Sequence, residues 1–289
     1  MRFRYIVFAG LLPVLFLATA RADECDPNDP TLLKPGFTSL APKRARVLQK
    51  GADRQLYFSS LLANVGPGPL TLQAQTVQTP SGPVTQATQV IQRTDGSTCT
   101  HVAGYFEFHP SHHHFHINDI AEYQLRKDDP LTGQVVARAS KISFCLIDVQ
   151  PLRGFSGQRQ VVSDCSVQEG TQGISVGWAD VYDDFYPEQS IDLDPDANTH
   201  VPAGGYFLVN VADPDHLLLK ADDSLEATAG YVSVSVPSLI GVPSGGGTSG
   251  GGTGRPPRPP HPVRPPRPPQ QTGSGPTHPA HPVHPTHNQ

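Results

Sequence analysis

Eight consecutive residues, 109–116 (HPSHHHFH), hold five of the 13 histidines in this 289-residue chain. Side chains two apart along a β-strand point to one face, so an extended run would project His112, His114 and His116 together. Imidazole nitrogens grouped in this way suit copper, zinc, nickel or iron. A purification tag and a solvated polar run are alternatives, but a tag stands at a terminus and this run lies mid-chain. The run therefore predicts a three-histidine metal site.

Two segments downstream of the histidines supply groups that a redox metal could use. Lys141 opens the sequence KISFCLID, and Tyr182 ends the sequence GISVGWADVY, with Asp180 two residues before it. A metal with open positions can bind a phenolate and O2 and oxidise the tyrosine ring, to which a neutral lysine amine can add. Desolvation disfavours the charged form of such a lysine and makes it a better nucleophile. The carboxylate of Asp180 could then remove a proton from a substrate.

Each of these three residues also has an ordinary interpretation. Lys141 could keep its ammonium in water at a strand end, Tyr182 could bond a backbone group, and Asp180 could cap a turn. What favours the chemical interpretation is that the three motifs, in this order, resemble those of a known family, and such a match is far more specific than any single residue.

In order and internal spacing, these motifs resemble the lysyl oxidase family of secreted copper amine oxidases, over roughly residues 105–193. The resemblance implies roles for six side chains: copper ligands His112, His114 and His116, precursors Lys141 and Tyr182 of a lysine tyrosylquinone cofactor, and catalytic base Asp180. His109 matches a histidine that is not counted among the ligands. The implied reaction converts a primary amine, as a peptidyl lysine or a small alkylamine, and O2 to an aldehyde, ammonia and hydrogen peroxide.

Two other functions remain open on the sequence alone. A non-catalytic exported copper-binding or buffering protein would keep the histidines and never form the quinone. A zinc hydrolase would need an acid–base carboxylate beside the metal, for which Glu107 or Glu122 could serve, but the helical histidine–glutamate motif of such enzymes is absent.

The N-terminus predicts export. Residues 1–22 combine a charged start, an apolar run of about 13 residues and a small-residue cleavage site after Ala22, as in a secretory signal peptide; a membrane span needs about 20 apolar residues. We expect a secreted or periplasmic protein without stable membrane insertion after cleavage. Export makes the four cysteines disulfide candidates, with three possible pairings. Our choice is Cys25–Cys99 with Cys145–Cys165, although the sequence alone does not decide.

Short runs of alternating apolar and polar residues, separated by turns such as Asp95–Gly96, predict an all-β fold. We expect strands near residues 45–48, 55–65, 70–74, 86–92, 121–126, 134–139, 141–147, 190–193, 205–211 and 230–236. Residues 23–45 are expected to form an extended N-terminal segment, and residues 150–180 a long loop region. No long helical pattern is found. A single β-sandwich domain with long loops, spanning residues 23–238, is the predicted architecture.

The composition changes over residues 239–289, where a glycine-rich linker leads into proline, arginine and histidine repeats. Such a segment lacks the apolar surface needed to offset its ordering entropy, so we expect a disordered tail. The tail could adhere to surfaces, capture metal loosely or be a dispensable solvated extension. The formal net charge of −5 and the absence of a basic patch with interleaved aromatics argue against nucleic-acid binding.

Overall fold

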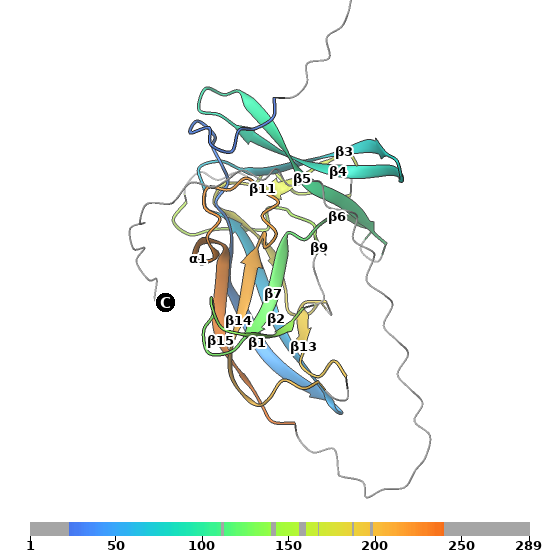
Figure 1. Cartoon of the computed structure of the whole chain (residues 1–289), viewed down its shortest axis with the longest axis vertical. Helices are drawn as coiled ribbons and strands as arrows, with labels where there is room; N and C mark the ends of the chain where they lie inside the picture. Colours follow the sequence, from blue (N-terminus) through green and yellow to red (C-terminus); the bar gives the residue numbers. More distant parts are fainter. Residues whose placement is uncertain are drawn as a thin grey trace, which may run out of the picture. The chain divides into compact units, whose positions relative to one another are not determined.

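The computed structural model describes residues 23–110, 113–139, 143–155, 160–166, 168–186, 188–196 and 199–239, and this part of the chain is almost entirely β-structure (Figure 1). The predicted all-β class is confirmed, because the described residues contain a single helix of four residues. In chain order the elements are β1 (Phe37–Lys50), β2 (Asp53–Asn64), β3 (Leu70–Thr79), β4 (Gly82–Gln92), β5 (Thr98–His109), β6 (His114–Asn118), β7 (Ala121–Arg126), β8 (Val135–Arg138), β9 (Ser143–Phe144), β10 (Gln150–Pro151), β11 (Thr171–Ile174), β12 (Trp178–Tyr182), β13 (Ser190–Asp192), β14 (Gly204–Ala212), α1 (Leu225–Thr228) and β15 (Ala229–Val236).

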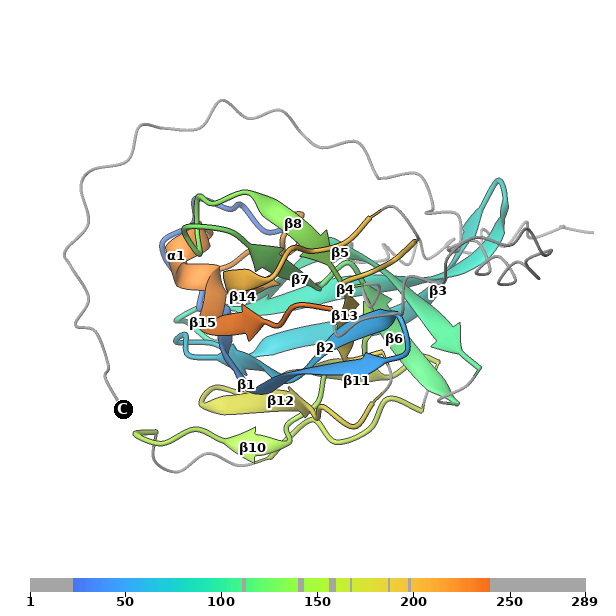
Figure 2. The same ribbon diagram turned by 90° about the horizontal axis from the view of Figure 1, so that it is seen from below.

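Within this part of the chain the named strands form three sheets, and every pairing between them is antiparallel. One sheet has the order β1-β2-β12-β10, with β13 also paired to β2; the second runs β11-β3-β4-β5-β6-β9, and the third β15-β14-β7-β8. The first and third sheets pack face to face, and Figures 1 and 2 show β14 and β15 against β1 and β2. Gly230 lies so close to β1 that an added Cβ would stand 2.3 Å from the carbonyl carbon of Leu40. The domain is therefore a sandwich extended by a further sheet.

Strand β2 runs through the centre of this arrangement, and its sequence shows why. Its first half alternates, with Leu56 and Phe58 buried between partly exposed neighbours, while every residue from Ser59 to Asn64 is buried. A strand covered on both faces needs no alternation. Phe58 packs edge-to-face on Tyr123 of β7, with ring centroids 5.0 Å apart, and so joins the two sheets of the sandwich.

The structure corrects two expectations about where strands begin. Strand β1 starts at Phe37, inside the segment expected to be merely extended. The sequence hides this strand because Pro42 interrupts it and Arg44 has φ 52°, with register shifts on both sides of Lys43. The proline and the irregular register are tolerated because β1 is the edge strand in the order β1-β2-β12-β10 and pairs there only with β2.

Residues 150–180, which we expected to form a long loop region, also contain strands. Strands β10 and β11 lie within it, and β12 begins there. Gly173 resembles a turn residue in sequence, but it lies in β11 with φ 152°, where a Cβ would fall 2.0 Å from the carbonyl oxygen of Leu70. The glycine is needed for the close approach of two strands rather than for a turn.

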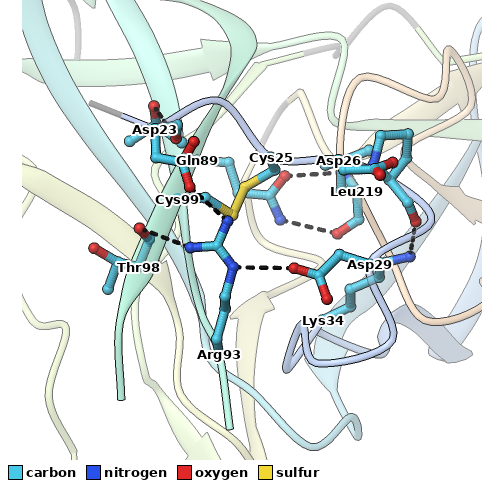
Figure 3. The surroundings of a disulfide bond; sticks show 12 residues. Asp23, Cys25, Asp26, Asp29, Lys34, Gln89, Arg93, Thr98, Cys99 and Leu219 are labelled. Carbon is cyan, nitrogen blue, oxygen red and sulfur yellow. Dashed lines mark hydrogen bonds and ion pairs between the residues drawn. A yellow bond between two sulfur atoms is a disulfide. The ribbon is translucent and has the colours of Figure 1, made fainter. Parts of the chain in front are cut away.

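Both disulfides join the cysteines that we chose. Cys25–Cys99 ties the start of the described chain to β5, and Cys145–Cys165 closes a loop with a sequence separation of 20. Figure 3 shows the first bond beside Arg93, whose guanidinium pairs with Asp29 at 3.0 Å and with Asp23 at 2.7 Å.

The predicted signal peptide, residues 1–22, and the predicted tail beyond Leu239 lie outside the described residues. Among the helices of the described part, none combines the length and apolar character needed to cross a membrane.

Candidate functional site

Two of the three predicted metal ligands lie on one short strand. The hairpin of β5 and β6 pairs His109 with His114 and Glu107 with His116, and the amide of His113 donates to the carbonyl of His109 at 2.9 Å. His114 and His116 share a face of β6, with ring centroids 4.8 Å apart. This arrangement is the one expected from their spacing.

The extended run is nevertheless shorter than predicted. His113 has φ 58° and belongs to the turn, so the strand begins only at His114. A four-residue connection between paired strands requires such a turn, and the sequence pattern did not distinguish it from strand. His112 lies outside the described residues.

His109 is closer to the predicted ligands than the sequence suggested. Its ring stacks on that of His116, with centroids 4.7 Å apart and planes inclined by 25°. The cause is the hairpin register, which places the last residue of β5 opposite the first residue of β6. Among the residues that the structure describes, no group of three or more His, Cys, Asp or Glu side chains has the geometry of a metal cluster.

The segment that begins with Lys141 runs beside the histidine strand. Strand β9 pairs with β6, placing Phe144 opposite Ile117 and Ser143 opposite Asn118. The hydroxyl of Ser143 lies 3.1 Å from Nδ1 of His116, a side chain buried to 1% exposure. If Nδ1 carries the proton and donates this bond, Nε2 keeps the lone pair that a metal ligand needs. Lys141 itself lies outside the described residues.

Tyr182 is fastened to the same segment. Its hydroxyl accepts from the amide of Cys145 and donates to the carbonyl of Cys145, both at 2.9 Å. The ring meets Phe144 edge-to-face at 5.1 Å. These contacts hold the phenol against the backbone four residues after Lys141, so two of the three sequence motifs meet at the backbone of one residue.

Asp180 lies two residues before Tyr182 on β12, and alternation along the strand places both side chains on one face. It is 2% exposed. Burial is the main cause that raises the pKa of Tyr182 well above 10, and the negative charge of Asp180 adds to this shift. The pKa of Tyr123 on β7 is also raised, mainly because the side chain is buried, and the negative charge of Asp180 again contributes. The charge of Asp180 therefore contributes to the raised pKa of the half-buried Tyr182 and of the buried Tyr123.

Sequence reasoning missed the buried polar residues around this carboxylate. The hydroxyls of Tyr123 and Ser60 are 2.6 Å apart, and Nε2 of Gln189 donates to Ser60 Oγ at 2.8 Å. Tyr123 occupies an inward position of an alternating strand and looks like a core aromatic. Nothing in the sequence distinguishes Tyr123 from an ordinary core aromatic, because its position beside Ser60 and Asp180 depends on the pairing of β2 with β12.

The Cys145–Cys165 disulfide links the two sides of the site. Cys145 holds the Tyr182 hydroxyl, while the carbonyl of Cys165 accepts from the amide of Phe115 at 2.9 Å. Phe115 lies between His114 and His116. The disulfide therefore connects Tyr182 to the histidine strand: Tyr182 is hydrogen-bonded to Cys145, Cys145 is bonded to Cys165, and Cys165 is hydrogen-bonded to Phe115 of β6.

Two acidic residues, Asp183 and Asp184, directly follow Tyr182 in the chain, and both are paired with arginines of β1. Arg44 lies 3.5 Å from both carboxylates, and Arg46 pairs with Asp184. These ion pairs leave the local charge balanced.

Comparison with known proteins relates the segments that carry the predicted site residues to one family. The model of a family described as lysyl oxidase matches residues 86–229, which include the histidine run and the segments carrying Lys141 and Tyr182. The chain is 32% identical over 118 residues to lysyl oxidase homolog 1 of Homo sapiens and, equally, of Bos taurus. The alignment covers 40% of this chain and 18% of each relative, so the chain spans less than a fifth of the length of these curated proteins.

Proposed function

This chain belongs to the lysyl oxidase family, and we propose that it is a copper-dependent amine oxidase. The proposed reaction takes a primary amine, O2 and water to an aldehyde, ammonia and hydrogen peroxide, which balances as RCH2NH2 + O2 + H2O → RCHO + NH3 + H2O2. The observation that carries the proposal is that the Tyr182 hydroxyl is hydrogen-bonded to both the backbone N–H and the backbone C=O of Cys145, in the segment that begins with Lys141.

The side chains present fit the copper that the family implies. Imidazole donors suit copper, and the two described ones, His114 and His116, are neighbours on one strand face. The Ser143 hydroxyl at Nδ1 of His116 is the kind of partner that orients a metal-bound imidazole. We propose His112, His114 and His116 as the ligands. Copper and a lysine tyrosylquinone made from Lys141 and Tyr182 would supply the electron transfer from amine to O2.

The remaining steps belong to the protein's own groups. Asp180 is the proposed base that takes the proton from the carbon bearing the amine, because it is buried on the strand face that carries Tyr182. The backbone N–H and C=O of Cys145 and the ring of Phe144 fix the orientation of the phenol. Burial keeps water from the carboxylate, because Asp180 is 2% exposed and Phe144 is fully buried, and this strengthens the electrostatic interaction between Asp180 and its neighbours.

We also propose that the protein is exported. Two disulfides persist in oxidising compartments, which agrees with residues 1–22 acting as a signal peptide. Residues 23–238 would then form the mature catalytic domain and residues 239–289 a tail. Mass measurement of the N-terminus of the protein collected outside the producing cell tests this, and we expect it to begin at residue 23.

The proposed reaction is tested with copper-loaded protein in air. We expect quinone staining and peroxide release with a primary amine in the wild type, loss of both in Lys141→Arg, and retention of both in Lys127→Arg, which replaces an exposed lysine away from the motifs. A protein that binds copper and yields neither signal with any amine would instead be the non-catalytic copper-binding alternative.

A further inference from the structure

The loop that follows Tyr182 exposes two large aromatic rings side by side. Phe185 is 66% exposed and Tyr186 is 41% exposed, and their ring centroids are 4.4 Å apart. Leaving such apolar surface in water costs free energy in proportion to its area. Scattered exposed apolar residues are ordinary, but two in contact form a small continuous surface that a ligand can cover.

The exposure does not arise from a loose loop, because hydrogen bonds hold both sides of the aromatic pair. The amide of Tyr186 donates to the carbonyl of Asp183 at 3.2 Å, and the carbonyl of Tyr186 accepts from the amide of Gln189 at 2.9 Å. Asp184, which precedes Phe185, is buried, and its amide donates to the Ser59 hydroxyl at 3.2 Å. The backbone therefore presents the two rings from a defined position.

The same rings continue inward to the proposed catalytic tyrosine. Tyr186 lies 6.3 Å from Tyr182 between ring centroids, and Tyr182 lies 5.1 Å from the fully buried Phe144. A row of aromatic rings thus runs from Phe144 in the core, past Tyr182, which is proposed to become part of the cofactor, to Tyr186 at the solvent. A substrate whose amine reaches Tyr182 from this side would lay its other end on Phe185 and Tyr186.

We propose that Phe185 and Tyr186 form a subsite for the aliphatic stem of the amine substrate, so that the enzyme prefers primary amines with long apolar stems. This inference rests on the proposed amine oxidase function. An alkyl chain covering the two rings gains roughly half of the full burial value per methylene, because one side of the chain stays in water. The passing ammonium is attracted by the ring faces.

Local charge favours this substrate class over polycations. Asp183 and Asp184 are paired with Arg44 and Arg46, so the two carboxylates that directly precede Phe185 in the chain are compensated by two guanidinium groups. A polyamine that depends on uncompensated acidic groups finds none in these two residues. We therefore expect apolar contact with the two rings to be the main basis on which this subsite distinguishes one amine substrate from another.

The first test compares straight-chain amines from ethylamine to hexylamine, together with spermidine, in the copper-loaded protein. In the wild type we expect KM to fall about twofold per added methylene, and spermidine to be a poorer substrate than hexylamine. Phe185→Ser should raise KM for hexylamine several-fold and for ethylamine less than twofold. Tyr231→Ser, which removes a 45% exposed ring from β15, should leave the series unchanged. An identical chain-length series in Phe185→Ser and wild type, or a preference for spermidine, would overturn the subsite.

A second measurement separates this inference from the proposed function. Calorimetric titration of copper-free protein with hexylamine needs no turnover, and we expect binding several-fold weaker in Phe185→Ser than in wild type or Tyr231→Ser. Weaker binding in the variant together with no peroxide release from the wild type would keep the subsite and refute the oxidase. Equal binding in all three proteins would refute the subsite whether or not the oxidase is active. Nα-acetyl-lysine amide, titrated in parallel, distinguishes a lysine side chain from a free alkylamine as the natural ligand.

Discussion

At the scale of single residues, Asp180 is the group on which the proposed chemistry depends most. A buried carboxylate beside two phenols has one obvious use in amine oxidation, which is to take a proton from the substrate carbon. We predict that Asp180→Asn still permits copper binding and Lys141–Tyr182 cross-linking but lowers kcat by roughly 10²–10⁴-fold, the usual contribution of general base catalysis. Turnover kinetics and peptide mass analysis on the same sample check this, and near-normal turnover in the variant would assign the base elsewhere.

Two phenols, the half-buried Tyr182 and the buried Tyr123, should resist ionisation in copper-free protein. Burial, assisted by the charge of Asp180, raises the pKa of both Tyr182 and Tyr123, so the folded state holds these protons more tightly than the unfolded state does. An unfolded tyrosine ionises near pH 10, and the stability contributed by the two protons is therefore complete below about pH 10 and is lost as pH rises further. Absorbance titration should show two tyrosines that ionise only with unfolding. In Tyr123→Phe the number should drop to one, and no change would contradict the assignment.

The residue types at the site could be predicted from the sequence, and several of their relations could not. Spacing alone placed His114 and His116 on one face. The stacking of His109 on His116 and the burial of Tyr123 beside Asp180 depend on strands that meet only in the folded chain. The pairing of Asp183 and Asp184 with β1 could not be foreseen either, because the arginines lie some 140 residues earlier in the chain.

At the scale of elements, period-two alternation identified β7 and β15, whereas β14 was identified by an apolar run that is buried at every position from Leu208 to Ala212. The strands that the sequence pattern did not predict were the start of β1 and the strands β10, β11 and β12. Pro42 and Gly173 are strand breakers in isolation, but one lies in a strand at the end of a sheet and the other at a close approach between strands. Local sequence does not report which neighbour a strand will have.

The disulfides allow a matched test of how the elements position the site. Cys25–Cys99 spans 74 residues and Cys145–Cys165 spans 20, so the chain-entropy account gives the first the larger stabilisation, about 4 against about 3 kcal/mol. We predict that Cys145→Ser/Cys165→Ser lowers the yield of the Lys141–Tyr182 cross-link more than Cys25→Ser/Cys99→Ser does, although it costs less stability. Denaturant unfolding and peptide mass analysis of both double variants decide this. Cross-link losses that simply follow the losses in stability would show that the nearer disulfide has no positioning role.

At the scale of the whole molecule, a buried ion pair fixes the segment after β14. Lys220 and Asp213 are both fully buried as side chains, with Nζ 2.7 Å from the carboxylate, and Lys220 also pairs with Asp223 at 2.9 Å. Burial raises the pKa of Asp213, and the charge of Lys220 opposes that shift. Removing one partner leaves the other buried without compensation.

We predict that Lys220→Met lowers the free energy of unfolding by roughly 3–5 kcal/mol. Lys220→Met/Asp213→Asn should recover part of this loss, because the uncompensated carboxylate is gone. Chemical denaturation of the wild type, the single variant and the double variant checks both statements. A single variant as stable as the wild type would mean that the pair contributes nothing to holding the fold.

The most direct test of the central claim is peptide mass analysis of the protein after copper loading in air. The account predicts a cross-linked species that joins the peptide containing Lys141 to the peptide containing Tyr182, absent without copper and absent in Lys141→Arg. Recovery of both peptides unmodified and unlinked, from protein shown to hold copper, would contradict it.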